Sequence, residues 1–176
     1  MQVPITLPRP TPGRQTEWSC FEPFLGVWGP LPGEPDDEGR RSVLRWGFPN
    51  KTVHFSEHRI VDGARVQVNE ALVGYHYGRQ RIVQLEFARD GLSPFEVMNE
   101  GTWEFLEDGT LVRVFRSYDP DMSSREYRET TSLLPDGRRR LAIEHRDDAG
   151  RWQPWPRGPF FTVRYPSLEA VAPGAS

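Results

Sequence analysis

The chain has a single cysteine, Cys20, among its 176 residues. No intramolecular disulfide and no cysteine-rich metal site can therefore form, and we interpret Cys20 as a small buried apolar residue. A basic excess is also missing, because 22 Lys and Arg residues face 25 Asp and Glu residues, a net charge of −3. Binding to a phosphate backbone depends on clustered positive charge, so we expect no nucleic-acid partner.

Long apolar runs are missing as well. No segment reaches the ~18 consecutive apolar residues of a membrane-spanning helix, and the first residues do not resemble a signal peptide. We therefore expect a cytoplasmic protein without a membrane partner. The sequence also has no glycine-rich phosphate loop and no closely spaced His or Cys pattern, so we expect no metal site.

The chain has short alternating segments of apolar and polar residues instead of long helical periodicity. Turn signals separate these segments about every ten residues, a spacing typical of all-β sandwiches and barrels. One further strand is expected at Trp28, and the proline-rich segment 152–159 is predicted to be a crossing loop. The predicted strands cover 41–48, 51–61, 64–75, 79–88, 93–106, 110–118, 124–134, 138–147 and 159–165.

The composition fits one globular domain, with 36% hydrophobic and 12% aromatic residues. Residues 1–15 contain four prolines and one glycine and are expected to be an arm outside the domain. The domain itself is expected to cover 16–166, with a short helix at 16–25 whose apolar side carries Trp18, Phe21, Phe24 and Leu25. Residues 167–176 are expected to be a tail.

Several short motifs point to a family. They are Phe24-Leu-Gly-Val-Trp28, Gly74-Tyr75, Gly101-Thr-Trp-Glu-Phe105, Tyr127-Arg-Glu-Thr, Leu134-Pro-Asp-Gly and Gly150-Arg-Trp152. With them the chain resembles the small bacterial lipocalin-like proteins of the DUF1579 type, which are similar in build to calycins and nitrobindins. The resemblance implies one antiparallel up-and-down barrel of about ten strands, a short N-terminal capping helix and a central cavity.

The same resemblance bears on cofactors. Nitrobindin-like proteins hold haem through a histidine, whereas the last predicted strand, Phe160-Phe-Thr-Val-Arg-Tyr165, contains none. We therefore expect neither haem nor any other cofactor.

In a barrel, turn type and alternation together predict which side chains point inward. A two-residue Asp108-Gly109 turn pairs Trp103 with Val114 and Phe105 with Val112, and places Glu104 opposite Arg113 on the outer face. The inward face then continues to Arg116 and Tyr118. A three-residue loop would instead set Trp103 against Arg113, and we favour the two-residue turn because it separates apolar from charged side chains.

The hairpin at 51–73 is predicted to turn at Asp62-Gly63. Val53 then pairs with Leu72, Phe55 with Glu70, Glu57 with Val68 and Arg59 with Val66. This face is the more apolar, so we place it inside, together with Glu57, Arg59 and Glu70. These three charged residues are interpreted as an ion-pair network or as part of the barrel rim.

The hairpin at 124–147 is predicted to turn through a three-residue loop, Pro135-Asp136-Gly137. Two ion pairs, Arg128 with Glu144 and Glu126 with Arg146, then lie outside. The inward pairs are Tyr127 with His145, Glu129 with Ile143 and Thr131 with Leu141. The run Arg138-Arg-Arg140 is interpreted as a solvated turn.

The segment 79–88 allows two arrangements. A loop at His76-Tyr77-Gly78 puts Ile82, Gln84 and Glu86 inside, as turn chemistry favours. A Tyr77-Gly78 turn puts Val83, Leu85 and Phe87 inside, as burial of apolar groups favours.

Two functional hypotheses follow. In the first, the cavity binds a small hydrophobic or amphipathic molecule. In the second, the barrel is a cofactor-free isomerase, cyclase or lyase in which Tyr127, Glu129 and His145 act as acid, base or oxyanion donor. A barrel filled by its own side chains is a third possibility, and homodimer formation stays open. The candidate ligand-binding residues are Arg59, Glu70, Trp103, Arg116, Tyr118, Tyr127, Glu129 and His145.

Overall fold

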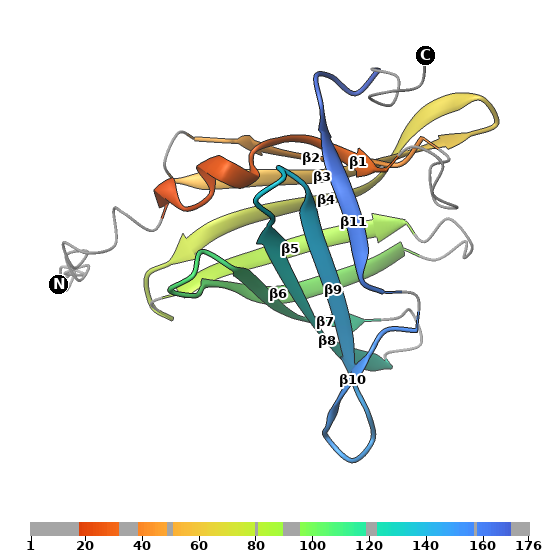
Figure 1. Cartoon of the computed structure of the whole chain (residues 1–176). Coiled ribbons are helices and arrows are strands. Elements are labelled where there is room, and N and C mark those ends of the chain that lie inside the picture. Colours follow the sequence, from red (N-terminus) through yellow and green to blue (C-terminus); the bar gives the residue numbers. More distant parts are fainter. Residues whose placement is uncertain are drawn as a thin grey trace, which may run out of the picture.

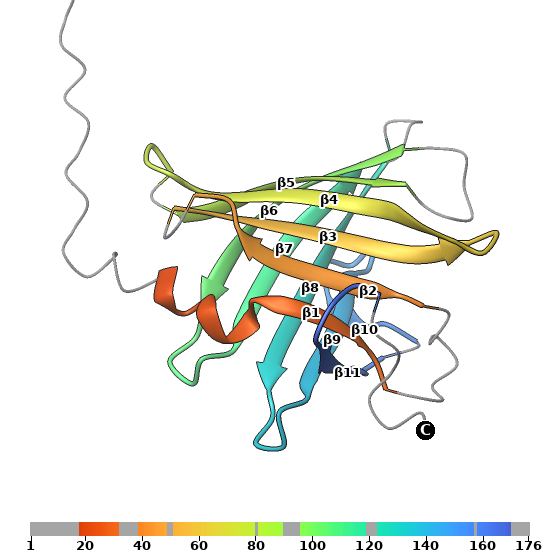
Figure 2. The same ribbon diagram turned by 90° about the horizontal axis from the view of Figure 1, so that it is seen from above.

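Ten antiparallel strands close into a barrel (Figures 1 and 2), as the sequence predicts. The computed structural model describes residues 18–31, 39–48, 51–79, 81–89, 96–118, 123–156 and 158–169. Strands β1 to β9 follow one another around the barrel, and β11 closes it between β9 and β1. The strands are β1 (Gly26–Pro30), β2 (Arg41–Trp46), β3 (Thr52–Val61), β4 (Ala64–His76), β5 (Arg81–Arg89), β6 (Glu96–Phe105), β7 (Leu111–Tyr118), β8 (Ser124–Leu133), β9 (Arg139–Arg146), β10 (Trp152–Pro154) and β11 (Phe160–Tyr165).

Strand β10 occupies residues 152–154 of the segment predicted to be a crossing loop, so the prediction is wrong for these three residues. Trp152 pairs with Arg146 and Pro154 with Glu144, at the end of β9 that β11 does not reach. Proline is tolerated there because a short edge strand leaves some N–H positions unused. In Figure 1 this β9–β10 hairpin extends below the barrel.

Short helical turns cover one end of the barrel. A 3-10 helix spans Glu22–Phe24, and Trp18, Phe21 and Phe24 are buried as expected. The ring of Phe21 meets that of Phe105 edge-on at 4.8 Å, within an apolar core that fills this end. Cys20 is exposed, which corrects its interpretation as a buried residue. The predicted arm at 1–15 lies outside the described residues.

The hairpin loops explain which predicted registers hold. Val61 pairs with Ala64 across Asp62-Gly63, whose φ angles of 50° and 77° are those of a type I′ turn. The loop at 135–137 has three residues, and Leu134 N donates to Arg138 O at 2.8 Å. Both turn types agree with the prediction.

The β6–β7 loop differs from the predicted one. Leu106 N donates to Thr110 O at 2.8 Å, so the loop contains three residues and ends at Gly109 with φ +80°. Asp108 supports it, because its Oδ1 accepts a 2.9 Å hydrogen bond from Thr110 N. The register therefore shifts by one, which pairs Trp103 with Arg113 and Glu104 with Val112.

This shift changes the inward set. Trp103, Leu111 and Arg113 are buried, and Phe105 packs against the core. Val112, Val114, Arg116 and Tyr118 belong to the outward face of β7, so their predicted inward placement is wrong. The predicted outward position of Arg113 is wrong, because inside the barrel its guanidinium pairs with the carboxylates of Glu86 and Glu129.

A β-bulge changes the β3–β4 register. Arg59 pairs with Val66 as predicted, but the register shifts between Glu57 and His58, so Phe55 pairs with Ala71 and Val53 with Val73. Glu57 is buried, as predicted. On β4 the bulge turns Leu72 and Glu70 outward, where both are exposed, and their predicted inward placement is wrong.

The remaining two hairpins are simpler. Every predicted inward pair of β8 and β9 is present, including Tyr127 with His145 and Glu129 with Ile143. In β5, Ile82, Gln84 and Glu86 are buried, whereas Leu85 and Phe87 are 45% and 56% exposed. The inward face of β5 is therefore the one in the arrangement that turn chemistry favoured, but the predicted His76-Tyr77-Gly78 loop is wrong, because His76 pairs with Arg81 and Tyr75 with Ile82.

Candidate functional site

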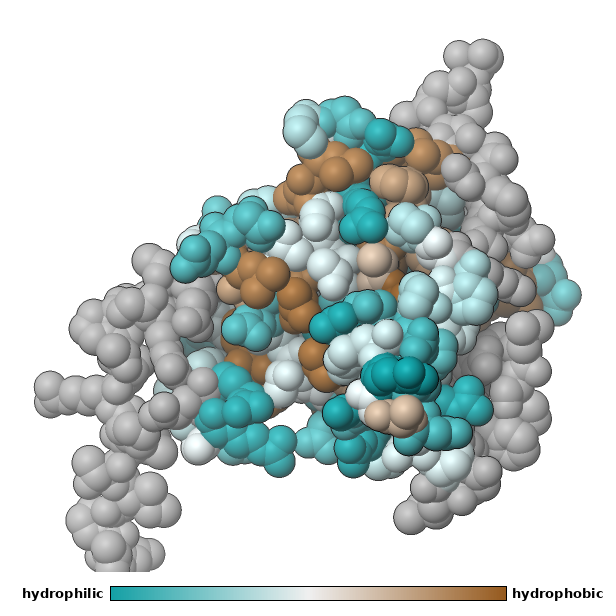
Figure 3. Space-filling view, turned by 60° about the horizontal axis from the view of Figure 1, so that its bottom comes forward, coloured by the Kyte–Doolittle hydropathy of each residue, from teal (hydrophilic) through white to brown (hydrophobic). Residues whose placement is uncertain are grey.

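The barrel encloses a cavity of about 770 Å³ beside the apolar core. The side chains of the barrel therefore do not fill its interior. Most of the side chains that line the cavity are aromatic or aliphatic. They include Phe24, Trp28, Phe55, Trp103, Phe115, Leu141 and Ile143. The face drawn in Figure 3 likewise shows apolar side chains recessed between polar ones.

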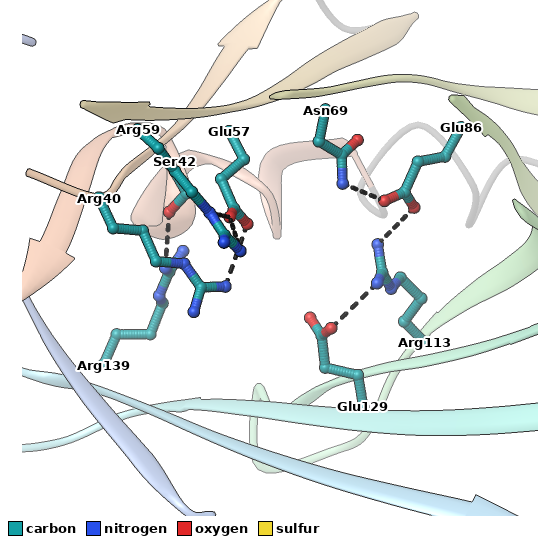
Figure 4. Close-up of polar contacts among 9 residues, drawn as sticks. All are labelled: Arg40, Ser42, Glu57, Arg59, Asn69, Glu86, Arg113, Glu129 and Arg139. Carbon is teal, nitrogen blue, oxygen red and sulfur yellow. Dashed lines mark hydrogen bonds and ion pairs between the residues drawn. The ribbon is translucent and has the colours of Figure 1, made fainter. Parts of the chain in front are cut away.

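One charged cluster on the cavity wall is centred on Arg113. We call Asn69, Glu86, Arg113 and Glu129 the Arg113 cluster (Figure 4). Arg113 Nη1 lies 2.9 Å from Glu86 Oε2, and Nη2 lies 3.0 Å from Glu129 Oε2. Glu86 also accepts a hydrogen bond from Asn69 Nδ2, and it is only 1% exposed.

The Arg113 cluster extends toward the apolar core. Gln84 Nε2 donates to Glu86, and Trp103 Nε1 donates to Gln84 Oε1. Burial lowers the pKa of Arg113, but the carboxylates of Glu129 and Glu86 outweigh this effect and raise that pKa above its ordinary value. The cluster is thus a buried cation with two acidic partners.

A second buried guanidinium, that of Arg139, has different surroundings. Its Nη2 donates to Ser42 Oγ at 2.8 Å and its Nε donates to Thr162 Oγ1 at 3.0 Å, so both acceptors are neutral hydroxyls. The guanidinium also lies 5.0 Å from the centre of the Trp28 ring. No carboxylate in the described part of the chain forms an ion pair with it. Burial lowers the pKa of Arg139 to about 10.

Two more arginines lie near Arg139 in Figure 4. Glu57 Oε2 lies 3.0 Å from Arg40 Nη2, and its Oε1 lies 3.1 Å from Arg59 Nη2. Glu57 thus pairs with Arg40 and Arg59, whereas Arg139 bonds to Ser42 and Thr162 instead. Arg40, Glu57 and Arg139 all line the same cavity as Arg113 and Glu129, so one side of the cavity carries more arginine than acid and the other carries a paired arginine.

A smaller pocket of about 220 Å³ lies farther along β8 and β9. Arg125, Tyr127, His145, Trp155 and Pro156 line it. The Tyr127 ring stacks on Phe115 at 5.3 Å, and Phe115 lines the large cavity, so these two rings lie where the pockets approach each other.

The structure distributes the predicted site residues over several places. Trp103 and Glu129 line the large cavity, whereas Tyr127 and His145 line the smaller pocket. Arg59 lies at the rim, with its side chain 45% exposed, and binds Glu57. Glu70, Arg116 and Tyr118 lie on the outer face, and Arg116 pairs there with Glu126 at 2.6 Å.

Three buried charged residues were not among the predicted site residues: Arg113 and Arg139, which line the cavity, and Glu86, which pairs with Arg113. Arg139 could have been found, since alternation from the inward Leu141 points it inward, but the Arg138-Arg-Arg140 run suggested a solvated turn. Glu86 belonged to the arrangement of β5 that turn chemistry favoured. Arg113 points inward only with the three-residue β6–β7 loop, whereas the sequence analysis favours a two-residue turn.

In the described ranges, no three His, Cys, Asp or Glu side chains come together as a metal ion would need. None of the helical segments described has the length and apolar character needed to cross a membrane. Comparisons of the chain with family models, with curated proteins and with solved structures found no match.

Proposed function

We propose that this protein binds a small, largely apolar molecule inside its barrel. The observation that carries the proposal is the cavity of about 770 Å³, bounded mainly by aromatic and aliphatic side chains with a few charged groups among them. Ligand pockets have volumes of about 300–1,000 Å³ and this same mixture of an apolar wall with a few placed polar groups. The resemblance of the sequence motifs to those of lipocalin-like proteins also led us to this proposal.

The enzymatic alternative has less support. Tyr127, Glu129 and His145 would have to act on one substrate, yet Glu129 lines the large cavity and the other two residues line the smaller pocket. The stacked rings of Phe115 and Tyr127 lie between the large cavity and the smaller pocket. We therefore favour binding over catalysis by these three groups.

The experiment is a titration with N-phenyl-1-naphthylamine, a neutral apolar dye whose fluorescence rises when it leaves water. We expect saturable binding with one dye per chain. In Ile143→Trp the larger side chain occupies part of the cavity, and we expect affinity to fall at least tenfold. The control is Val114→Trp, which adds the same ring on the outer face, where Val114 is 36% exposed, and should bind as the wild type does.

Dye binding that is absent, or that both variants weaken equally, would contradict the proposal. Native mass spectrometry of the purified protein adds an independent measurement, because a co-purified ligand would be seen directly as added mass.

A further inference from the structure

Arg139 is the feature that the proposed function leaves unexplained. A buried charge normally lies against an opposite charge, because desolvation of an unpaired ion costs several kcal/mol. Arg139 is 8% exposed and lies beside the neutral hydroxyls of Ser42 and Thr162. The Arg113 cluster of the same barrel follows the usual rule, with two carboxylates around one guanidinium.

The guanidinium of Arg139 retains free donors. Arginine carries five N–H groups, and the hydrogen bonds to Thr162 and Ser42 use one on Nε and one on Nη2. Arg139, Ser42 and Thr162 all line the large cavity. A planar guanidinium matches a carboxylate in shape, since two parallel N–H groups can bind its two oxygens.

We propose that the cavity takes an amphipathic monoanion, with a carboxylate or similar head bound by Arg139 and an apolar body against the aromatic wall. This inference rests on the proposed function and adds the class of ligand. One buried cation without a carboxylate partner matches one negative charge. A neutral ligand would leave Arg139 unpaired.

The distribution of charge fixes the direction in which such a ligand lies. On the Arg139 side, Arg40 and Arg59 pair with the carboxylate of Glu57, whereas Arg139 is bonded to Ser42, as Figure 4 shows. The guanidinium of Arg113, which also lines the cavity, already pairs with the carboxylates of Glu86 and Glu129. The head therefore lies by Arg139, and the body extends along the wall that includes Trp28 and Phe55.

The test uses matched pairs of acid and alcohol as competitors of bound N-phenyl-1-naphthylamine. The pairs are dodecanoic acid with dodecan-1-ol, and 2-naphthoic acid with 2-naphthalenemethanol, at a neutral pH where both acids are ionised. For wild-type protein we expect at least one acid to compete at least tenfold more strongly than its alcohol, which corresponds to about 1.4 kcal/mol. Arg139→Met should reduce this preference to less than twofold and still bind the dye.

Two further variants complete the test. Arg140→Met removes an arginine from the opposite face of β9 and should keep the acid preference. Arg139→Lys keeps the charge but loses the two parallel N–H donors of the guanidinium, so it should keep part of the preference for acid over alcohol. Circular dichroism reports whether each variant folds. Where Arg139→Met does not fold, the wild-type comparison still tests the preference for an acid over its alcohol, and Arg139→Lys tests the part of Arg139 in it.

The outcomes separate the two proposals. Wild-type protein that does not bind the dye would refute the binding function itself. Wild-type protein that binds the dye but takes neither acid better than its alcohol would overturn only the anion site. A preference that Arg139→Met and Arg140→Met retain equally would also overturn it, because the head would then lie elsewhere.

Discussion

Arg113 lies directly opposite Trp103 in the β6–β7 pair, and its guanidinium carbon is 5.9 Å from the centre of the Trp103 ring. Both side chains point into the barrel, and hydrogen bonds through Gln84 and Glu86 connect them. A buried network of this kind links three neighbouring strands. The contribution of this network to the free energy of unfolding depends on each polar group in it keeping a hydrogen-bond or ion-pair partner.

Replacement of Arg113 tests this dependence. Arg113→Met leaves the carboxylates of Glu86 and Glu129 without their cation in the interior. We expect the free energy of unfolding at pH 7 to fall by about 3–5 kcal/mol, measured by urea denaturation. The triple variant with Glu86→Gln and Glu129→Gln removes both charges and should recover part of this loss. A loss below about 1 kcal/mol in Arg113→Met would contradict the network's role.

Arg139 should respond in the opposite way. Arg139→Met removes a buried charge that has no acidic partner in the described part of the chain, and it places an apolar side chain against Trp28. In the absence of ligand, we expect the free energy of unfolding to stay within about 1 kcal/mol of wild type or to rise. The same urea experiment measures it. A loss as large as that of Arg113→Met would mean that the bonds to Ser42 and Thr162 make Arg139 a structural residue.

Gly101 is a position where a side chain does not fit. A Cβ added there would lie 2.6 Å from Val114 O and 2.6 Å from Phe115 Cβ, so β6 and β7 would have to separate. We expect Gly101→Ala to lower the free energy of unfolding by about 1–3 kcal/mol. The control is Gly74→Ala, another strand glycine, where a Cβ would have Thr52 Cγ2 as its nearest neighbour at 3.8 Å. Equal effects of the two substitutions would contradict the steric argument.

Glu126 gives a prediction on pH. It bridges β7, β8 and β9, with Arg116 at 2.6 Å and Arg146 at 2.7 Å, and the hydrogen bonds from Arg146 and Arg116 lower its pKa below the ordinary 4.5. Because folding favours the ionised form, this contribution is present above the pKa of the unfolded state and is lost as pH falls through the lower folded value.

For this partly exposed group we expect a contribution of up to about 1 kcal/mol. Glu126→Gln should therefore be less stable than wild type at pH 7, and the difference should shrink toward pH 3 in thermal unfolding. Glu104→Gln, an exposed outward position on β6, is the control and should show a smaller change. A difference that is the same at both pH values would mean that packing, not the charge, is responsible.

Much of the fold follows from residues close together in the chain. Alternation and the spacing of turns predicted about ten strands, and the resemblance to lipocalin-like proteins implied that they form one barrel. The Pro135-Asp136-Gly137 loop set the β8–β9 register with its outer ion pairs. Such features are local because a hairpin needs only its own turn and two adjacent strands. The same local rules placed Tyr127, Glu129 and His145 on one face.

The candidate site depended on contacts that no local rule contains. Arg113 points inward because Glu86 of β5 and Glu129 of β8 receive its charge, and Arg139 binds Ser42, 97 positions away in the chain. The bulge beside Glu57 and the three-residue loop at Gly109 each shift a register by one residue, which exchanges inner and outer faces. The sequence alone determined that the chain forms a barrel. Only the tertiary structure decided which charges lie inside, because the free energy of a buried charge depends on partners from distant strands.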